Sequence, residues 1–290
     1  MIFIIFDKLN LLKETHMKKL ILSLLILFIT LRIYGQKDER YYSMSEALKD
    51  PKKVYFLSLY SSDITILNDS IGLLTNLTNL ELGLNQIAVL PKNITKLTNL
   101  TELFLNSNQL TELPEDIGKL TKLEKLSLNT NHLSKLPESF SKLINLKELG
   151  ITSNNFNVFP EVITALPSLT TLTIFNNQLT TLPESITKLK NLTTLHLNSN
   201  QFTTVPECIT KLPSLTTLYL NSNQITALPE SIGNLTNLTT LLLDGNQITA
   251  LPESITKLTK LMKFTIHNND KLILTPDQQQ FKKMVFEKTN

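Results

Sequence analysis

The sequence predicts an α/β solenoid, in which a parallel sheet lines the concave side and short 3-10 or turn segments form the convex side. Three observations predict this fold: evenly spaced prolines, a Leu-rich alternating segment before each proline, and an asparagine between the two. The eight prolines lie 23 residues apart, at Pro91, Pro114, Pro137, Pro160, Pro183, Pro206, Pro229 and Pro252. Such a period is typical of solenoids, because each turn buries its apolar side only against its neighbours.

One turn of the solenoid comprises the 23 residues from Leu77 to Asn99, which read LTNLELGLNQIAVLPKNITKLTN, and we number its positions from Leu77. Further turns begin at Leu100, Leu123, Leu146, Leu169, Leu192, Leu215 and Leu238. An imperfect turn begins at Val54 and a truncated one at Leu261. The copies share one register, so chance does not explain them.

The first part of each turn alternates apolar and polar residues, as in Leu80-Glu81-Leu82. This alternation predicts a half-buried strand. Strands of consecutive turns must run parallel, since each turn returns by the same route. At a spacing of about 4.8 Å, ten strands would form a curved sheet of about 45 Å.

An asparagine follows each strand at the ninth position. These residues are Asn85, Asn108, Asn131, Asn154, Asn177, Asn200, Asn223 and Asn246. An asparagine side chain carries two donors and an acceptor, so a row of them can satisfy buried backbone groups. Without this row, each unsatisfied group would cost about 1–3 kcal/mol. We therefore interpret the row as structural.

The second part of each turn contains a Leu-Pro pair followed by Pro-x-x-Ile-x-x-Leu. Proline keeps the preceding residue out of helical geometry, and the three-residue spacing of apolar side chains predicts a short helical turn on the outer wall.

This frame resembles the leucine-rich repeat family, in particular the 23-residue L-P-x-x-I class of many bacterial proteins and of Ras-associated intracellular scaffolds. The match runs from Val54 to about Asn269, so we assign residues 54–269 to repeats. The resemblance implies a right-handed horseshoe that recognises proteins. The periodicity by itself establishes only the solenoid.

The two ends of the array require caps, because an open solenoid exposes core and sheet edge. We assign residues 36–53 to an N-terminal cap, where Ser43 and Glu46 fit a capping box before a short amphipathic helix that Pro51 should end. In the imperfect first turn, Ser62 replaces the asparagine and Asn68 the proline.

Residues 270–290 are predicted to form a C-terminal capping helix. Thr275, Pro276 and Gln278 supply an N-cap, a first-turn proline and a capping-box partner. The helix should place Phe281, Met284 and Val285 on one face against the last turn.

Residues 1–35 resemble a leader, with two lysines after Met17, an apolar run from Leu20 to Leu31, and a small residue at Gly35. This pattern predicts a secretory signal peptide starting at Met17 rather than Met1. The run is shorter than the ~20 residues of a membrane span, so no stable span is expected after cleavage. An uncleaved amphipathic anchor is the alternative.

The composition argues against several classes of function. Cys208 is the only cysteine, so no internal disulfide can form, and its surroundings predict an inert thiol. The net charge of +3 comes largely from the leader, and no basic stripe with interleaved aromatics supports nucleic-acid binding. No cysteine or carboxylate lies at metal-ligand spacing from a histidine, and no cofactor motif is present. We therefore predict a protein that is not an enzyme, without metal or cofactor.

The concave face is predicted from the strand alternation, which points positions three, five and seven away from the core. Four large residues there belong to consecutive turns: Phe175, His196, Tyr219 and Leu242. Polar residues Asn198, Asn221 and Asp244 surround them, so we define these seven residues as the concave patch. Exposed aromatic residues with a polar rim are typical of interaction hot spots.

A smaller front patch contains Phe104 among Glu81, Glu102 and Glu124. The opposing interpretation is that single exposed aromatics are ordinary strand residues. His196 beside Tyr219 could also form a catalytic pair, but no third group orients it.

Two hypotheses for the function follow. In the first, an exported bacterial repeat protein binds another protein, or alternatively a glycan, through its concave sheet in the periplasm, at the cell surface or in the medium. In the second, the chain is a cytoplasmic signalling scaffold similar to the Ras-associated class. A mature chain that begins near Gln36 would support export.

Overall fold

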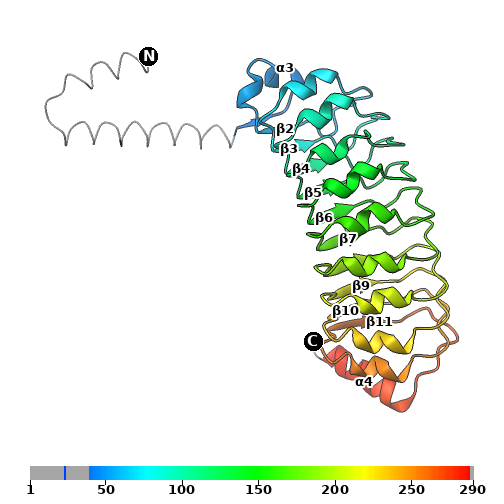
Figure 1. The fold of residues 1–290 in the computed structure, drawn as a ribbon. Coiled ribbons are helices and arrows are strands. Elements are labelled where there is room, and N and C mark those ends of the chain that lie inside the picture. The colour runs from blue at the N-terminus through cyan, green and yellow to red at the C-terminus, as the bar shows by residue number, and fades with distance from the viewer. Residues whose placement is uncertain (1–22, 24–38, 288–290) are drawn as a thin grey trace.

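The computed structural model of the protein describes residue 23 and residues 39–287. Within residues 39–287, eleven strands form one parallel sheet in strict chain order, which confirms the predicted fold class. Figure 1 shows the turns stacked along a single curved column that ends at helix α4. The predicted leader, residues 1–35, lies outside the described residues apart from residue 23.

The strands are short and lie one per turn. They are β1 (Arg40–Tyr41), β2 (Phe56–Ser58), β3 (Asn79–Glu81), β4 (Glu102–Phe104), β5 (Lys125–Ser127), β6 (Glu148–Gly150), β7 (Thr171–Thr173), β8 (Thr194–His196), β9 (Thr217–Tyr219), β10 (Thr240–Leu242) and β11 (Lys263–Thr265). From β2 onward, equivalent positions of neighbouring turns pair, as Leu149 does with Leu172. Each row of side chains therefore runs along the solenoid axis.

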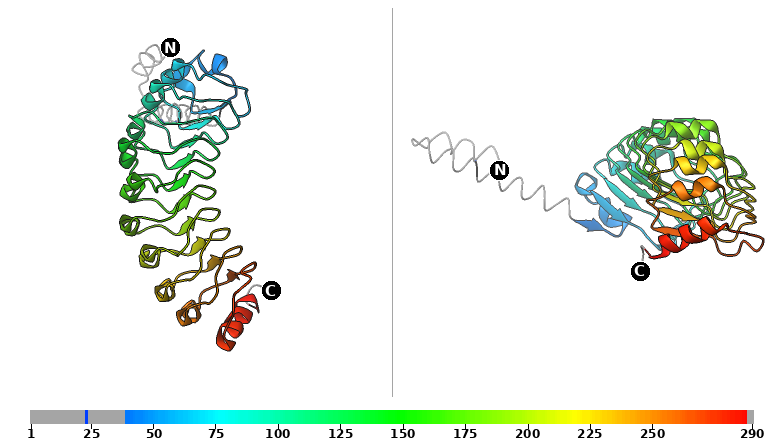
Figure 2. Two further views of the ribbon diagram at one scale, coloured as in Figure 1. Left: turned by 90° about the vertical axis from the view of Figure 1, so that its right-hand side faces the viewer. Right: turned by 90° about the horizontal axis from the view of Figure 1, so that it is seen from below.

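The opposite wall carries 3-10 helices, as the Pro-x-x-Ile-x-x-Leu spacing predicts. They are η1 (Pro51–Lys53), η2 (Asp69–Leu73), η3 (Lys92–Lys96), η4 (Ile117–Lys119), η5 (Glu138–Lys142), η6 (Glu161–Ala165), η7 (Glu184–Lys188), η8 (Glu207–Lys211), η9 (Glu230–Asn234) and η10 (Glu253–Lys257). Figure 2 (left) shows these helices on the outside of the curve and the strands on the inside. In most turns an extended proline precedes the helix, as Pro183 does at φ −73° and ψ 149°.

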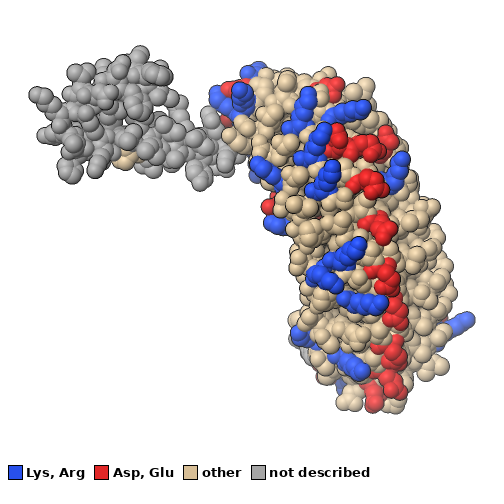
Figure 3. All heavy atoms as spheres, in the orientation of Figure 1, with Lys and Arg blue, Asp and Glu red and all other residues tan. Residues whose placement is uncertain are grey.

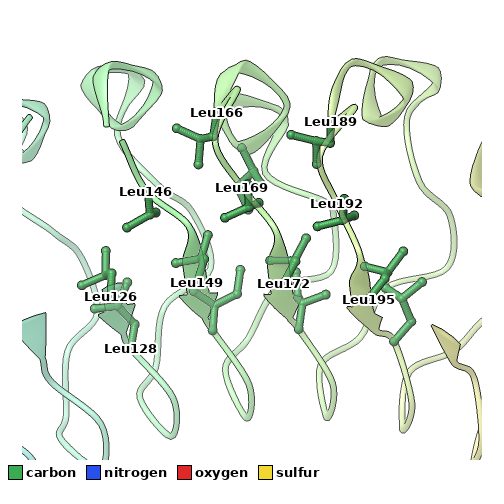
Figure 4. Packing of buried hydrophobic residues seen from close by; sticks show 14 of the residues in the cluster. Leu126, Leu128, Leu146, Leu149, Leu166, Leu169, Leu172, Leu189, Leu192 and Leu195 are labelled. Atoms are coloured by element: carbon green, nitrogen blue, oxygen red, sulfur yellow. The ribbon is translucent and has the colours of Figure 1, made fainter. Parts of the chain in front are cut away.

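The core between the two walls is one continuous stack of leucines. Leu149, Leu172 and Leu195 lie on successive strands and are at most 1% exposed. Figure 4 shows them in register, with Leu146, Leu169 and Leu192 in a parallel row. Because every turn buries its leucines against the next, the sheet on the inner side is held in a fixed curvature.

The N-terminal cap differs from the prediction in two respects, an added strand and the role of Pro51. Residues Arg40–Tyr41 add strand β1 to the sheet, giving eleven strands instead of ten. Helix α3 (Met44–Ala47) has the predicted cap, in which Ser43 Oγ accepts a hydrogen bond from Glu46 N at 3.3 Å, but it spans a single turn. Pro51 does not end this helix; it begins η1, because proline also fits the first position of a helix.

The C-terminal helix α4 (Pro276–Glu287) has the predicted capping box. Thr275 N donates to Gln278 Oε1 at 3.1 Å, and Gln278 N donates to Thr275 Oγ1 at 3.4 Å. Phe281 and Val285 are buried as expected, but the prediction for Met284 is wrong, since its side chain is 40% exposed. The face in contact with the last turn instead includes Gln278, whose Nε2 donates to Leu251 O at 3.0 Å.

None of the helices within the described part of the chain is both long and apolar enough to cross a membrane.

Candidate functional site on the concave sheet

The backbone beneath the concave face is held by the ninth-position asparagines. In a typical turn, Asn131 Oδ1 accepts from Leu110 N at 3.0 Å, and its Nδ2 donates to Leu105 O and Leu128 O, each at 3.0 Å. Each side chain thus joins its own turn to the preceding one. The predicted ladder is confirmed, and it extends to Asn269, whose Oδ1 accepts from Ile248 N. The ladder makes the concave surface a rigid platform.

Two further ladders were not predicted from the sequence. Asparagines at the last position of a turn donate to a carbonyl of the preceding turn, as Asn145 Nδ2 does to Thr121 O at 2.8 Å. Threonines at the second position do the same, as Thr193 Oγ1 does to Thr170 O at 3.0 Å. The signal was visible in the repeat itself, where both residue types recur in register.

His196, Tyr219 and Leu242 occupy one row across β8, β9 and β10. Their Cα atoms are paired in the sheet, and all three side chains are half-buried. The rings of His196 and Tyr219 are stacked, with centroids 4.0 Å apart and planes 3° from parallel. Burial lowers the pKa of His196, so its imidazole is neutral at pH 7.

Phe175 is offset from this row. On β7, the residue paired with His196 is Thr173. Phe175 lies two positions further along the same turn, beside Asn198 of the next turn. The structure therefore brings three of the four large residues into one line, with Phe175 on the diagonal.

The rim of the concave patch contains unused hydrogen-bonding capacity. The Oδ1 atoms of Asn198 and Asn221 are buried, and no residue of the described chain donates to them. Asp244 differs, because its Oδ1 accepts from His267 N at 2.6 Å and lies 2.9 Å from His267 Nδ1, while Thr265 Oγ1 bonds to its Oδ2. Asp244 is therefore engaged with the last strand, while the two asparagines have acceptors to spare.

The front patch is more acidic than the concave patch. Glu124 pairs with Lys147 at 2.7 Å, and Glu148 pairs with Lys125 at 3.2 Å. Within residues 39–287, neither Glu81 nor Glu102 forms an ion pair; they accept from Ser58 Oγ at 2.6 Å and Asn79 Nδ2 at 2.7 Å. These two carboxylates flank Phe104. Lys125, the residue paired with Glu102 on β5, is a neighbouring cation, but it forms its ion pair with Glu148.

A hollow of about 180 Å³ lies between the two patches. We call it the Gly150 hollow; Phe104, Ser127, Asn129, Gly150, Thr171 and Thr173 are among its lining residues. The hollow was not predicted from the sequence, although the fifth-position row shows its cause: Ser127, Gly150 and Thr173 are small, with Phe104 and His196 at either end.

The convex side carries a column of acidic side chains, visible in Figure 3. Each of η5 to η10 begins with a glutamate. Several of these join neighbouring turns: Glu161 Oε1 accepts from Ser185 Oγ at 2.8 Å, and Glu184 Oε2 lies 3.2 Å from Lys211 Nζ. We interpret this column as part of the scaffold.

Groups that could hold a metal or act as a nucleophile are sparse in the part that the structure describes. Among residues 39–287, no three histidine, cysteine or carboxylate side chains are placed so that they could hold a metal ion together. Cys208 is buried, and burial raises the pKa of its thiol, so the thiol is protonated at neutral pH.

Comparison with protein families identifies the repeats. Three leucine-rich repeat models match the chain: "Leucine-rich repeat region" at residues 129–222, "Leucine Rich repeats (2 copies)" at residues 98–142 and "Leucine rich repeat" at residues 213–270. The repeats of this chain are therefore leucine-rich repeats, which typically mediate protein binding. Among curated proteins, none matches the chain.

The solved structures that resemble this one include plant receptors. The plant peptide hormone receptor RGFR1 in complex with RGF2 has a TM-score of 0.61 at 30% identity, over 72% of this chain and 37% of the receptor. A TDR receptor has a TM-score of 0.62 at 27% identity, over 76% of this chain and 45% of the receptor.

A third similar structure is the ectodomain of the receptor kinase GASSHO1/SCHENGEN3 from Arabidopsis thaliana in complex with CASPARIAN STRIP INTEGRITY FACTOR 2. Its TM-score is 0.61 at 26% identity, over 81% of this chain and 33% of that one. The present chain thus spans less than half the length of each of these three receptors.

Proposed function

We propose that the protein is a non-enzymatic scaffold of the 23-residue L-P-x-x-I class that binds another protein through its concave sheet. The observation that carries this proposal is the row of His196, Tyr219 and Leu242, which stands half-buried on three adjacent strands of a rigid platform. Aromatic residues held rigidly amid polar groups lose little entropy on binding. Two of the similar receptors are named in complex with a partner, which supports a binding function.

The stacking of His196 on Tyr219 favours a binding role over a catalytic pair. The rings meet face to face, and within the described chain no hydrogen bond orients the imidazole. A general base needs a partner within hydrogen-bonding reach and a group that fixes its tautomer.

Affinity capture with the purified protein tests the proposal. Replacing Phe175 and Tyr219 together by alanine should abolish capture of the wild-type partner while leaving the fold intact by circular dichroism. The matched control replaces Val158 and Ile273, apolar residues that are 72% and 79% exposed, by alanine. Capture that survives the Phe175→Ala/Tyr219→Ala pair would place the partner elsewhere.

For localisation, we propose export of a bacterial protein to the periplasm, surface or medium after cleavage of the leader. The supporting observation is the Met17–Gly35 pattern of basic, apolar and small residues. The mass of the mature N-terminus decides between this proposal and a cytoplasmic scaffold. Export requires a chain that begins near Gln36, whereas retention of Met17 or Met1 would contradict it.

A further inference from the structure

The Gly150 hollow lies where three small residues follow one another in the fifth-position row of the concave sheet. Ser127, Gly150 and Thr173 are paired neighbours on β5, β6 and β7, and Phe104 is paired with Ser127 on the other side. A Cβ atom at position 150 would lie 2.7 Å from Asn129 Nδ2, so even alanine would disturb this floor. Asn129 is fixed there, because its Oδ1 accepts from Thr152 N at 2.8 Å. The floor of the hollow thus consists of Gly150 and of the Asn129 side chain, which a hydrogen bond fixes in place.

The volume of the hollow suits one bulky side chain. A cavity of about 150 Å³ in a protein core admits a benzene molecule. The Gly150 hollow measures about 180 Å³, and its lining includes the ring of Phe104 as well as the Lys125–Glu148 ion pair. A phenyl or isobutyl group seated there would contact this ring and leave its backbone at the surface.

The aromatic stack at the other end of the row argues against a ligand, such as a sugar ring, that would lie flat on an aromatic face. Because His196 and Tyr219 stack from strand to strand, the ring faces point along the solenoid axis. The rings therefore present their edges, with the imidazole nitrogens and the phenol hydroxyl, to the concave side. Such edges offer hydrogen bonds to peptide groups, whereas sugar rings are recognised on aromatic faces.

The acidic residues beside Phe104 determine which sign of charge a partner should carry at this end of the row. Glu81 and Glu102 are held by Ser58 and Asn79. Lys125 is paired with Glu102 across the sheet, but its ion pair is with Glu148, so Glu81, Glu102 and Glu148 outnumber this one ammonium group. A carboxylate pair next to an aromatic ring favours a lysine or arginine side chain. By contrast, the residues next to His196 at position three of its own turn and at positions three and five of the preceding turn are threonines, which carry no charge.

We propose, building on concave-face binding, that the Gly150 hollow anchors a bulky apolar side chain of an extended peptide that runs across the strands, and that Glu81 and Glu102 bind a basic residue of the same peptide. Glu81 and Gly150 lie three strands apart, which is about 14 Å, or about four residues of extended chain. Tyr219 lies three strands away on the other side, at the same distance. The peptide thus spans the front patch, the hollow and the ring edges.

Selection of random peptides on the full chain tests this proposal. A displayed library of about twelve-residue peptides, long enough to span both intervals, is selected on wild-type protein, and the enriched peptides are synthesised for affinity measurement. We expect a bulky apolar residue with a lysine or arginine about four positions away. Ser127→Phe fills the hollow from the neighbouring strand and should weaken these peptides by about tenfold or more.

Val158→Phe is the control for Ser127→Phe. It places the same side chain at an exposed position outside the concave patch, the front patch and the hollow. Affinity should be unchanged in this control. Replacing Glu81 and Glu102 by glutamine should reduce the preference for basic peptides and its dependence on salt.

Each other outcome has a defined meaning. Peptides weakened by Phe175→Ala/Tyr219→Ala but not by Ser127→Phe would overturn the anchor subsite and leave concave binding standing. Peptides insensitive to both changes would overturn both proposals. Enrichment without an apolar-basic pair, or no enrichment while a glycan array binds, would also overturn the anchor subsite.

Discussion

At the scale of single residues, the ninth-position asparagine stabilises the fold by satisfying several buried backbone groups at once. Asn131 is 5% exposed. Its side-chain Oδ1 accepts from the backbone N–H of Leu110, and its Nδ2 donates to the carbonyls of Leu105 and Leu128. All three are buried groups where the chain leaves the sheet. No other uncharged side chain of this size offers both donors and an acceptor, so the residue type follows from the geometry.

Replacing Asn131 by alanine should therefore lower the free energy of unfolding by about 2–3 kcal/mol, because several buried backbone groups lose their partners. The control is Asn145→Ala, which removes a bond of similar length, 2.8 Å to Thr121 O, from an exposed side chain. That loss should stay below about 1 kcal/mol, because water replaces the bond. Equilibrium urea unfolding of both variants measures the difference, and equal effects would refute the assigned role of the ladder.

The residue before each ladder asparagine adopts a left-handed conformation, which suits some side chains better than others. Thr130 has φ 57°, a strained value for a β-branched residue, whereas Asn176 and Asn268 tolerate 53° and 54°. Thr130→Asn should raise the free energy of unfolding by about 0.5–1 kcal/mol. The reverse test is Gly245→Thr at φ 64°, where a Cβ would meet nothing nearer than 3.7 Å. That change should destabilise through backbone strain alone, and a neutral result would contradict this account.

His196 makes the stability depend on pH. Its pKa is lowered by burial, so the unfolded chain binds the proton more readily than the folded one. The free energy of unfolding should therefore fall as the pH is lowered below about 6.5, the ordinary histidine value. In His196→Gln this component disappears. Urea unfolding at several pH values compares the two proteins, and identical pH dependence would show that the ring is not desolvated.

At the scale of elements, the capping helix α4 seals the last turn by combining a polar and an apolar contact. Gln278 completes the capping box and also donates to Leu251 O, while Phe281 packs against Phe264 with ring centroids 6.0 Å apart. Because solenoid ends have no further neighbour, this single interface replaces a whole turn.

Phe281→Ala should cost about 3–5 kcal/mol, as expected for a buried phenylalanine. Phe286 lies on the same helix and is 69% exposed, so Phe286→Ala should have a small effect. Hydrogen exchange should localise the Phe281→Ala defect to β11 and η10. A defect spread equally over all strands would argue against a local cap.

The elements inside the repeats were predictable, while those at the ends were only partly so. Within the array, the 23-residue period fixes strand, asparagine and 3-10 helix at once, and neighbours reinforce every position. At the ends this reinforcement is missing. Strand β1 consists of two residues that pair only because β2 offers a free edge, and nothing in Arg40–Tyr41 signals it. Met284 fits the helical period of Phe281 and Val285, yet its side chain remains exposed.

At the scale of the whole molecule, the sequence predicted which residues share a row of the concave sheet. It did not predict the orientation of the rings or the Gly150 hollow. Alternation identified His196, Tyr219 and Leu242 as neighbours, and the sheet pairs them. The direction of the rings depends on packing between strands, and the Gly150 hollow is lined by side chains from several strands, Asn129 among them. Both are properties of side-chain placement that periodicity does not encode. Whether these residues bind a partner remains a prediction for the experiments above.

The solenoid as a whole should respond to damage as a one-dimensional chain. Side-chain hydrogen bonds between turns join residues 21 to 27 positions apart, so each turn contacts its immediate neighbours. Leu172→Ala in β7 should remove about 2–5 kcal/mol from the central interfaces. Amides of β6, β7 and β8 should then exchange hydrogen faster, while those of β3 keep their protection, since separate turns open separately. A uniform rise in exchange from β3 to β10 would instead show that the array unfolds as one cooperative unit.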